Sequence, residues 1–500
     1  MPVPFFAQPA RFYNRTSELS ALQRAYDTNV QDGQLLLIYG RRRLGKTYLL
    51  QRFFAGAPGD KPKYHCYFLA DQTTNSAQRL SLAQQLLDSF PDTGVSTADL
   101  AVSWSAILRF VTQQARQNSG PERVTLILDE FPYLVQQTPE LPSILQSWWD
   151  REGIHSHLLV VLCGSQLSAM KALGSESAPL FGRFNAGILP LAPLGFQDVA
   201  GFYKGCPEYS IQQTLTMYGV FGGTPRYHAL VNTNLPFGEE LVNLLIRPGG
   251  ALENEVNYLL SSEQIREPAP YNAILSTIAQ GETQSGGIMS SLGMERGALS
   301  YYLNTLLELG WIHRELPFDE TSDRRSLYQV ADPFLTFWYR CIRPYASAIS
   351  FADPQTIFQT RILPRLSDYM GRYVFENICH QWLRRYAVTD LERILVNAGR
   401  WWSRDNSLEF DIVARCEDGT YIFGECKWST TSPVGVDVYS QLLGKVARHP
   451  DAAWRNNPSY LIFSAGDFTP ELKTIAKASG GTLLLIGAQQ LLPDWLRTKG

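Results

Sequence analysis

The stretch Leu35-Leu-Leu-Ile-Tyr-Gly40-Arg-Arg-Arg-Leu-Gly45-Lys-Thr-Tyr48 decides the fold of the first part of the chain. Its apolar start, residues 35–39, predicts a buried strand of a parallel sheet, and the apolar pattern after Thr47 predicts a helix. The residues between them fit the motif G-x-x-x-x-G-K-[ST] in full. A strand, a glycine-rich loop and a helix in this order are typical of a nucleotide-binding α/β domain.

Each residue type in this loop suits phosphate binding. The glycines let backbone N–H groups close around phosphate oxygens, at a helix start whose dipole favours anions. Lys46 is expected to reach the terminal phosphates of ATP, and the Thr47 hydroxyl to ligate Mg²⁺. The residues expected to contact the nucleotide are Gly40, Arg41, Arg42, Arg43, Leu44, Gly45, Lys46, Thr47 and Tyr48.

Two further predicted strands end in polar residues. In residues 123–131, Arg-Val-Thr-Leu-Ile-Leu-Asp-Glu-Phe, the apolar run is followed by two carboxylates. Asp129 is expected to hold the Mg²⁺ shell through water, and Glu130 to polarise the attacking water. Residues 158–166 lead to Ser165, which is predicted to sense the γ-phosphate and therefore to contact the nucleotide; a capped turn is the alternative.

Arg183 follows Gly182 in a loop sequence, residues 178–184. It is a candidate arginine finger, which would supply positive charge to the transition state from a neighbouring subunit. This role predicts a homo-oligomer. An ordinary surface arginine is the alternative.

The composition excludes several classes of protein. With 500 residues, 45% of them hydrophobic, the chain is expected to hold about three globular domains. The net charge of −3 gives no overall nucleic-acid signature, so any basic surface is local. Seven scattered cysteines without zinc-ligand spacing favour reduced thiols in a cytoplasm. The start lacks a signal-peptide pattern, and no apolar run reaches the ~18 residues of a membrane span.

Residues 250–330 predict a winged-helix domain. Short helical patterns are followed by two strands with a polar tip at residues 318–325, in the order typical of that fold; the helices are expected at 271–280, 285–292 and 296–309, and the strands at 311–316 and 326–330. The third helix would be the one that contacts DNA. A structural or partner-binding module is the alternative, because this helix carries one arginine near its start and phosphate binding needs several cations.

A second set of charged residues lies in residues 371–500. Asp411 lies in an alternating strand, and Glu425-x-Lys427 lies in its predicted hairpin partner. Strand alternation puts Glu425 and Lys427 on one face. Two close carboxylates, Asp411 and Glu425, favour a divalent cation, Glu376 on the preceding helix is expected to complete its ligands, and Lys427 would orient or deprotonate a water. A solvated charged face is the alternative.

Five motifs, in this order, resemble the archaeal-type ATPase family of AAA+/STAND-related P-loop proteins: Gly-Arg-Arg-Arg-Leu-Gly-Lys-Thr, Leu-Asp-Glu-Phe-Pro-Tyr, Gly-Ser, Leu-Phe-Gly-Arg and Gly-Gly-Thr-Pro-Arg-Tyr. The resemblance covers roughly residues 10–240. It implies an AAA-type α/β core with ATP as nucleotide, and it places the finger-like arginine at Arg183.

The resemblance extends to the end of the chain. The family often carries a winged helix after its ATPase core and a PD-(D/E)XK, or restriction-endonuclease-like, domain at its end. Glu409-Phe-Asp-Ile-Val-Ala414 and Gly424-Glu-Cys-Lys-Trp428 match that last domain. One departure is that Phe410, and not a proline, precedes Asp411.

The sequence therefore predicts an α/β chain in four parts. These are a P-loop AAA-like ATPase domain with a parallel sheet and a helical lid-like end at 10–240, an α+β winged-helix domain at 250–330, a helical linker at 331–370 and an α/β restriction-endonuclease-like domain at 371–500.

The expected function is ATP binding and hydrolysis coupled to a Mg²⁺-dependent DNA endonuclease, in DNA processing or defence against foreign DNA. Asp411, Glu425 and Lys427 are its expected catalytic residues, together with Glu130 and Arg183 of the ATPase. One alternative is a STAND-like signalling ATPase whose C-terminal domain binds partners. The other is a DNA-binding regulator with a catalytically silent nuclease fold.

Overall fold

The computed structural model describes residues 12–28, 32–56, 63–91, 93–118, 122–263, 265 and 267–497. The chain divides into two compact units, Met1–Ala192 and Pro193–Gly500.

The first unit is built on a five-stranded parallel sheet in the order β2-β3-β4-β1-β5. The strands are β1 (Gln34–Tyr39), β2 (Cys66–Leu69), β3 (Val124–Asp129), β4 (Leu158–Gly164) and β5 (Gly187–Pro190). The predicted α/β fold with a parallel sheet is confirmed. Because β1 pairs with β4, and β4 with β3, the polar residues that follow these three strands meet at one edge of the sheet.

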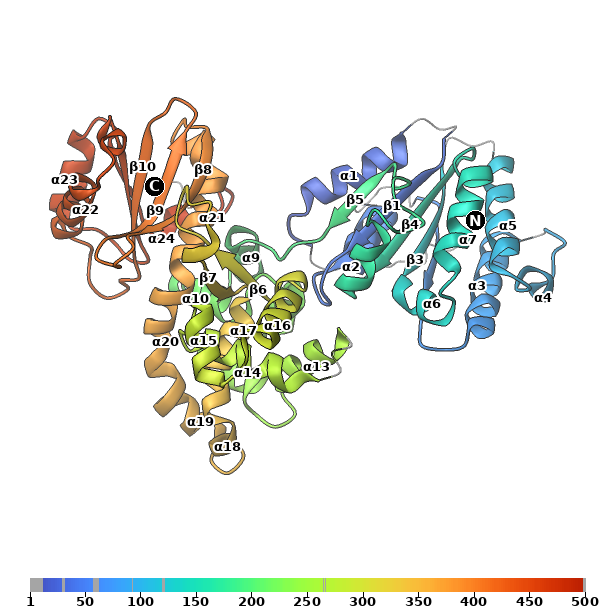
Figure 1. The fold of residues 1–500 in the computed structure, drawn as a ribbon, viewed down its shortest axis with the longest axis horizontal. Coiled ribbons are helices and arrows are strands. Elements are labelled where there is room, and N and C mark those ends of the chain that lie inside the picture. Colours follow the sequence, from blue (N-terminus) through green and yellow to red (C-terminus); the bar gives the residue numbers. More distant parts are fainter. Residues whose placement is uncertain are drawn as a thin grey trace. The chain divides into compact units, whose positions relative to one another are not determined.

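Helices cover both faces of this sheet (Figure 1). Leu36 and Ile38 of β1 pack toward one face, with α1 (Thr16–Asp27) and α2 (Lys46–Ala55). Leu35 and Leu37 alternate to the other face. That face is covered by α3 (Asn75–Ser89), α5 (Trp104–Gln117), α6 (Phe131–Gln137), α7 (Leu141–Trp148) and α8 (Leu167–Leu173), and the short α4 (Thr97–Leu100) lies between α3 and α5 in the chain.

The second unit begins with helices that the sequence assigned to the ATPase domain. They are α9 (Phe196–Val199), α10 (Ile211–Phe221), α11 (Pro225–Leu230), α12 (Phe237–Leu245) and α13 (Glu255–Ser262). The first compact unit ends at Ala192, earlier than the expected boundary at 240, because α10 packs against α17 (Pro333–Phe337) and α24 (Ala488–Leu491).

Three helices and a hairpin follow in the predicted order. They are α14 (Pro268–Ala279), α15 (Ser285–Leu292), α16 (Arg296–Glu308), β6 (Ile312–Glu315) and β7 (Leu327–Val330), with β6 antiparallel to β7. The residues between β6 and β7, together with the two strands, are called the wing below. The expected linker is helical but packed, since Phe334 and Phe337 of α17 are buried. It continues through α18 (Ala346–Ile349), α19 (Pro354–Ile357) and α20 (Leu363–Tyr369).

The chain ends in a mixed five-stranded sheet in the order β12-β11-β10-β9-β8. Strands β8, β9 and β10 are antiparallel, and β10, β11 and β12 are parallel. The elements are α21 (Phe375–Asp390), β8 (Leu395–Trp402), β9 (Glu409–Cys416), β10 (Tyr421–Lys427), α22 (Val436–Arg448), β11 (Ser459–Ser464), α23 (Pro470–Ala478) and β12 (Leu483–Ile486).

Helices α21 and α22 lie on opposite faces of this sheet (Figure 1). Phe423 of β10 packs with Leu442 of α22. On the other face, Trp382 of α21 contacts Phe463 of β11 at 5.5 Å between ring centroids. The alternation of β10 therefore turns Glu425 toward α22, because Glu425 is two residues after Phe423.

The tip of the wing packs against the mixed sheet, and the expected polar tip is wrong at Phe318. Only 5% of Phe318 is exposed, and its ring lies in the cluster that contains Tyr421 and Trp454. The Phe318 backbone N–H donates a hydrogen bond of 2.6 Å to the carbonyl of Arg400 in β8. An apolar ring at the tip is more stable buried than exposed, which explains why the tip docks.

Candidate functional site

The loop after β1 has the conformation that phosphate binding needs. Gly45 has φ 89°, in the left-handed region that favours glycine, and it precedes α2. A Cβ at Gly40 would lie 2.6 Å from the carbonyl oxygen of Leu191, so only glycine fits there. Lys46 is buried, and its Nζ donates to the carbonyls of Gly40 at 2.7 Å and Arg41 at 3.1 Å.

Thr47 and Asp129 meet although they are far apart in the sequence. The Thr47 hydroxyl donates a hydrogen bond of 3.1 Å to Asp129 Oδ2, and Asp129 is buried at the end of β3. Both offer oxygen ligands, which Mg²⁺ prefers, and a nucleotide-bound Mg²⁺ needs only one or two protein ligands. The pair therefore fits the predicted Mg²⁺ role.

Tyr67 of β2 is a site residue that the sequence analysis missed. Its hydroxyl donates to Asp129 Oδ2 at 2.7 Å. Burial and the nearby Asp129 carboxylate raise the pKa of Tyr67, so its hydroxyl stays protonated and remains a donor. The signal for this contact is the parallel register of β2 and β3, in which Leu69 lies opposite Asp129.

Glu130 and Ser165 also contact each other. The Ser165 hydroxyl donates to the Glu130 carboxylate at 2.8 and 2.7 Å, and the Ser165 backbone N–H donates to it at 3.2 Å. Glu130 has φ 51°, an uncommon backbone conformation for a residue with a side chain. The contact places the predicted base and the predicted sensor side by side at the ends of β3 and β4.

Arginines before and within the loop add contacts that the sequence did not specify. Arg42 donates to the Tyr133 hydroxyl at 2.6 Å and to the Ser165 hydroxyl at 3.4 Å. Arg15, which is buried, donates to the carbonyl of Leu44 at 3.1 Å.

The other predicted nucleotide residues differ in burial. Leu44 is buried, Arg41 and Arg43 are half-buried, and Tyr48 is half exposed on α2. The nucleotide contacts assigned to these four residues stay predictions.

Arg183 is paired within its own chain. Its Nε and one terminal nitrogen donate to the two carboxylate oxygens of Asp150 at 2.9 and 2.8 Å, and its other terminal nitrogen donates to the carbonyl of Phe181. The hydrogen bonds from Arg183 lower the pKa of Asp150. An arginine finger would have to leave this ion pair, so the finger role and the oligomer that it implies stay predictions.

In the second unit, Glu425 is held by two lysines. Lys427 Nζ lies 2.8 Å from one carboxylate oxygen of Glu425, and Lys445 Nζ of α22 lies 2.7 Å from the other. The Glu425 side chain is 8% exposed, and Lys427 and Lys445 are partly exposed. Lys427 therefore lies on the same face as Glu425, as strand alternation predicted.

Asp411 lies where β9 and β10 separate. The paired residues run from Tyr421 opposite Arg415 to Gly424 opposite Ile412, and the Cys426 backbone N–H then donates to Asp411 Oδ2 at 2.8 Å. Burial, reinforced by Glu376 and Glu425, raises the pKa of Asp411 to about 7. Burial and the two neighbouring carboxylates therefore disfavour the ionised form of Asp411.

Glu376 is held by Arg400. The two form an ion pair of 2.7 Å between Arg400 Nε and a Glu376 carboxylate oxygen. Burial raises the pKa of Glu376 to about 8, although Arg400 opposes the shift. His380, one turn later on α21, has Nε2 2.9 Å from the carbonyl of Asp411, and burial lowers its pKa to about 4.

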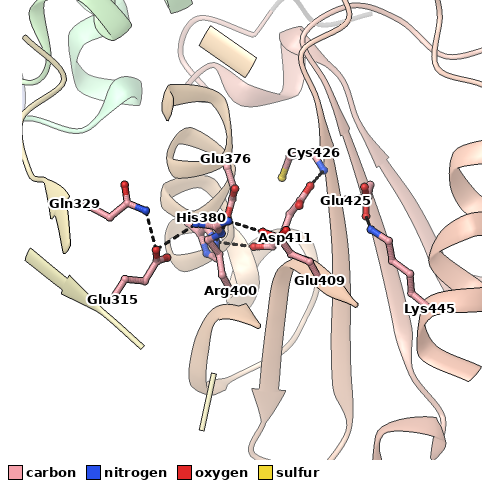
Figure 2. A network of polar contacts seen from close by, with 10 residues as sticks. All are labelled: Glu315, Gln329, Glu376, His380, Arg400, Glu409, Asp411, Glu425, Cys426 and Lys445. Carbon is pink, nitrogen blue, oxygen red and sulfur yellow. Dashed lines mark hydrogen bonds and ion pairs between the residues drawn. The ribbon is translucent and has the colours of Figure 1, made fainter. Parts of the chain in front are cut away.

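The three carboxylates do not converge into one set of metal ligands. In Figure 2, Glu376 and Arg400 lie on one side of Asp411, and Glu425 with Lys445 lies on the other. Within the part of the chain that the structure describes, no group of three or more His, Cys, Asp or Glu side chains is placed to hold a metal ion. The reason is that α21 and α22 cover opposite faces of the sheet. The residues as placed do not fit a metal, and the metal role of Glu376, Asp411 and Glu425 stays a prediction.

Two further findings concern the cysteines and the helices. All seven cysteines are free thiols. None of the helices in the described residues has the length and apolar composition needed to cross a bilayer. A cytoplasmic location stays a prediction.

Three family models match this chain. Residues 12–231 match an ATPase domain predominantly from Archaea, residues 272–314 match the arsR family of bacterial regulatory proteins, and residues 338–437 match archaeal and bacterial proteins of unknown function.

The chain is also similar to individual proteins. An uncharacterized protein of Methanocaldococcus jannaschii is 28% identical over 479 residues, which are 92% of this chain and 100% of that protein. An uncharacterized ATP-binding protein of the same organism is 45% identical over 42 residues, which are 8% of this chain and 68% of that protein.

A solved structure, the Walker-type ATPase of Pyrococcus abyssi, aligns with a TM-score of 0.51 at 18% identity. The alignment covers 67% of this chain and 98% of that one, and at this identity it supports the fold. Residues 12–231 are therefore similar to this predominantly archaeal ATPase domain, and Lys46, Thr47, Asp129 and Glu130 all lie within the matched stretch.

Proposed function

We propose that ATP is bound and hydrolysed at the edge of the parallel sheet in the first unit. The observation that carries this proposal is the pair of contacts Thr47–Asp129 and Ser165–Glu130 at the ends of β3 and β4. Lys46 and the loop N–H groups would bind the phosphates, and Thr47 and Asp129 would hold Mg²⁺, which neutralises phosphate charge when bound. Glu130 accepts a proton from the attacking water, and Ser165 orients Glu130.

Two variants test this assignment. Lys46→Ala is expected to abolish ATP binding, whereas Glu130→Gln is expected to retain binding and lose turnover, because it removes the base and keeps the shape. ATP binding measured by calorimetry and phosphate release measured with purified full-length chain give the two readouts. Turnover at the wild-type rate in Glu130→Gln would contradict the role of Glu130.

We further propose that residues 272–314, a helix-turn-helix segment, bind DNA. The match of residues 272–314 to a family of regulatory proteins supports this, and α16 exposes Arg296, Ser300 and Tyr301. Because the wing tip is packed on the mixed sheet, α16 is the element expected to contact the major groove of DNA. Fluorescence anisotropy of a labelled duplex across salt concentrations tests this. Arg296→Ala should reduce the salt slope by about one, and an absence of binding would contradict it.

The mixed sheet is proposed to carry a nuclease-like site. One helix, three antiparallel strands, a second helix and a parallel strand place Asp411, Glu425 and Lys427 on neighbouring strands. In the conformation seen, each carboxylate is already held by a cation or an amide of the chain, so a rearrangement must precede any cleavage. DNA processing or defence against foreign DNA would be the setting.

A second candidate function is favoured by the same ion pairs. Two lysines on Glu425 and an arginine on Glu376 satisfy the carboxylates without a metal. In a DNA-binding or signalling ATPase whose nuclease fold has no catalytic activity, these ion pairs would be permanent. Incubation of the chain with single-stranded, duplex and branched DNA and Mn²⁺ distinguishes the two functions. A nuclease should cleave DNA and lose this activity in Glu425→Ala, whereas a catalytically inactive protein should cleave none of these substrates.

A further inference from the structure

Arg42 is a cation of the phosphate-binding loop that is held by uncharged groups. One terminal nitrogen donates to the Tyr133 hydroxyl at 2.6 Å, and Nε donates to the Ser165 hydroxyl at 3.4 Å. In the part of the chain that the structure describes, Arg42 forms no ion pair, and its side chain is exposed. A guanidinium that is accessible and has no carboxylate partner is suited to binding an anion.

The partners of Arg42 lie at the ends of β3 and β4. Ser165 directly follows β4, and its hydroxyl also donates to both carboxylate oxygens of Glu130 at 2.8 and 2.7 Å. Tyr133 lies in the first turn of α6, which follows Glu130 in the chain. Arg42 is thus separated from Glu130 by one hydroxyl group. A water activated by Glu130 has to lie beside the γ-phosphorus of ATP, so Arg42 is within reach of the phosphoryl group that is transferred.

Arg183, the candidate arginine finger, is held more firmly than Arg42. Two of its nitrogens donate to the Asp150 carboxylate at 2.9 and 2.8 Å, and such bidentate pairs are among the stronger polar contacts. Both hydrogen bonds of Arg42 go to neutral hydroxyls, and the contact with Ser165 is long for an N–H···O bond. The negative charge of a γ-phosphate therefore competes more easily for Arg42 than for Arg183.

We propose that Arg42 is a further catalytic residue, and that its guanidinium leaves Tyr133 and Ser165 to bind the γ-phosphate of ATP in the same subunit. The water oxygen bonds to the γ-phosphorus, and one water proton passes to Glu130. The bond from the γ-phosphorus to the β–γ bridging oxygen breaks, and its electron pair stays on ADP. Arg42 stabilises the negative charge on the transferred phosphoryl oxygens during this step. The inference rests on the proposed ATP hydrolysis in the first unit.

Steady-state ATP hydrolysis by the full chain is the first test. Arg42→Ala is expected to lower kcat by about 10³-fold, the lower end of the effect of a catalytic arginine. ATP affinity in calorimetry should stay near the wild-type value, because Lys46 and the loop still bind the phosphates. Arg42→Lys keeps the charge without the planar donor fork and should recover part of the rate. Arg52→Ala is the matched control, since Arg52 donates to the carbonyl of Gly56 at the far end of α2.

Binding of ADP with aluminium fluoride and Mg²⁺ gives a readout that does not depend on turnover. The fluoride complex resembles the transferred phosphoryl group, so its affinity reports on contacts made in the transition state. Arg42→Ala should weaken this complex about as much as it lowers kcat, and ADP alone should bind as it does to wild type. Equal affinity of Arg42→Ala and wild type for the fluoride complex, or an equal loss of affinity for ADP alone, would overturn the catalytic role.

Thermal unfolding checks that the variants are folded, which the exposure of Arg42 leads us to expect. If Arg42→Ala is unstable, Arg42→Lys replaces it, with a smaller loss of kcat and of fluoride-complex affinity. Tyr133→Phe removes the hydroxyl that holds Arg42 and should leave kcat near the wild-type value. An equal loss of kcat in Tyr133→Phe and Arg42→Ala would assign the effect to the contact between these two residues and overturn a role at the phosphate.

Mixed subunits test whether Arg42 acts in its own subunit. Arg42→Ala chains mixed with Lys46→Ala chains should recover no hydrolysis, because Arg42 and Lys46 are needed in one site. Recovery on mixing would show that Arg42 reaches a neighbouring subunit and would overturn the assignment to the same subunit.

The outcomes for Arg42 and for the proposed function are distinguishable. Turnover that is lost in Glu130→Gln but retained in Arg42→Ala would keep the ATPase and remove the role of Arg42. Turnover that is retained in Glu130→Gln but lost in Arg42→Ala would keep the role of Arg42 and remove that of Glu130. An absence of turnover in wild type would remove the proposed hydrolysis and, with it, the role of Arg42.

Discussion

The hydroxyl of Tyr67 donates a 2.7 Å hydrogen bond to the same oxygen of Asp129 that accepts from Thr47. Asp129 is buried, and its Oδ1 accepts a further hydrogen bond of 2.8 Å from the Glu130 backbone N–H. Tyr67 therefore helps to hold Asp129 in the orientation in which it would bind Mg²⁺ together with Thr47.

Replacing Tyr67 by phenylalanine is expected to lower the affinity of the ATPase site for Mg²⁺, so that ATP hydrolysis needs more Mg²⁺. The Mg²⁺ concentration at half-maximal rate should rise about tenfold, the effect of losing a hydrogen bond to a charged group, while the maximal rate at saturating Mg²⁺ changes little. Tyr64→Phe is the matched control, because its hydroxyl donates at 2.6 Å to the carbonyl of Ser89 and not to the site. The same shift in both variants would show that Tyr67 acts only through packing.

Replacing Ser165 by alanine is expected to lower kcat for ATP by about tenfold and to leave ATP affinity near the wild-type value. The alanine removes the hydroxyl that orients Glu130 but keeps the backbone N–H that also donates to it. Ser165→Thr, which restores a hydroxyl, should recover most of the rate. A lower affinity with unchanged kcat would instead indicate that Ser165 contacts the nucleotide in the ground state.

Arg183 and Asp150 offer a direct test of the arginine finger, since either substitution breaks their ion pair. If Arg183 is a finger, Arg183→Ala should lower ATP turnover at least tenfold in the oligomer, whereas Asp150→Asn should leave turnover equal or higher. Mixing Arg183→Ala subunits with Lys46→Ala subunits should restore part of the activity. Equal effects of the two single substitutions would leave Arg183 as a structural residue.

His228 makes the second unit sensitive to acid. Its two ring nitrogens lie 2.7 Å from the Tyr203 hydroxyl and 2.7 Å from the carbonyl of Gly222, and burial lowers its pKa to about 4. The ordinary pKa of histidine is about 6.5, so the stability contributed by neutral His228 is complete above pH 6.5 and is lost as the pH falls toward 4.

Thermal unfolding between pH 7.5 and pH 4.5 measures this effect. The raised pKa values of Asp411 and Glu376 act in the opposite direction, because these carboxyls favour the folded state when protonated. The informative quantity is therefore the difference between wild type and His228→Gln, whose melting temperature should fall less on acidification. Parallel pH profiles would contradict the contribution of His228.

Much of the nucleotide site could be predicted because its motifs are local. The loop of residues 40–47 lies within one strand–loop–helix segment, and Asp129 with Glu130 ends one apolar strand. Tyr67 could not be found in this way, since its contact with Asp129 depends on β2 lying beside β3. The ion pair of Arg183 with Asp150 could not be predicted either, because it joins residues that are far apart in the sequence.

The second unit was harder to predict because two distant segments share one core. The strands that carry Asp411 and Glu425 follow from alternation and a turn, but alternation also turns Glu425 toward α22 and away from Glu376 on α21. The polar tip predicted at residues 318–325 includes Phe318, which the structure buries beside Tyr421. β8, the strand that carries Arg400 and receives the wing, had no clear pattern of alternation.

The most direct test of the central claim, that an ATPase unit is joined to a nuclease-like site, is DNA cleavage by the full chain with Mn²⁺ and ATP. The account predicts that wild type cleaves at least one of single-stranded, duplex or branched DNA. Glu425→Ala/Lys427→Ala should lose cleavage while hydrolysing ATP normally, and Lys46→Ala should lose the part of cleavage that depends on ATP. If wild type hydrolyses ATP but cleaves none of these substrates, the claim is contradicted and a catalytically inactive nuclease fold is favoured.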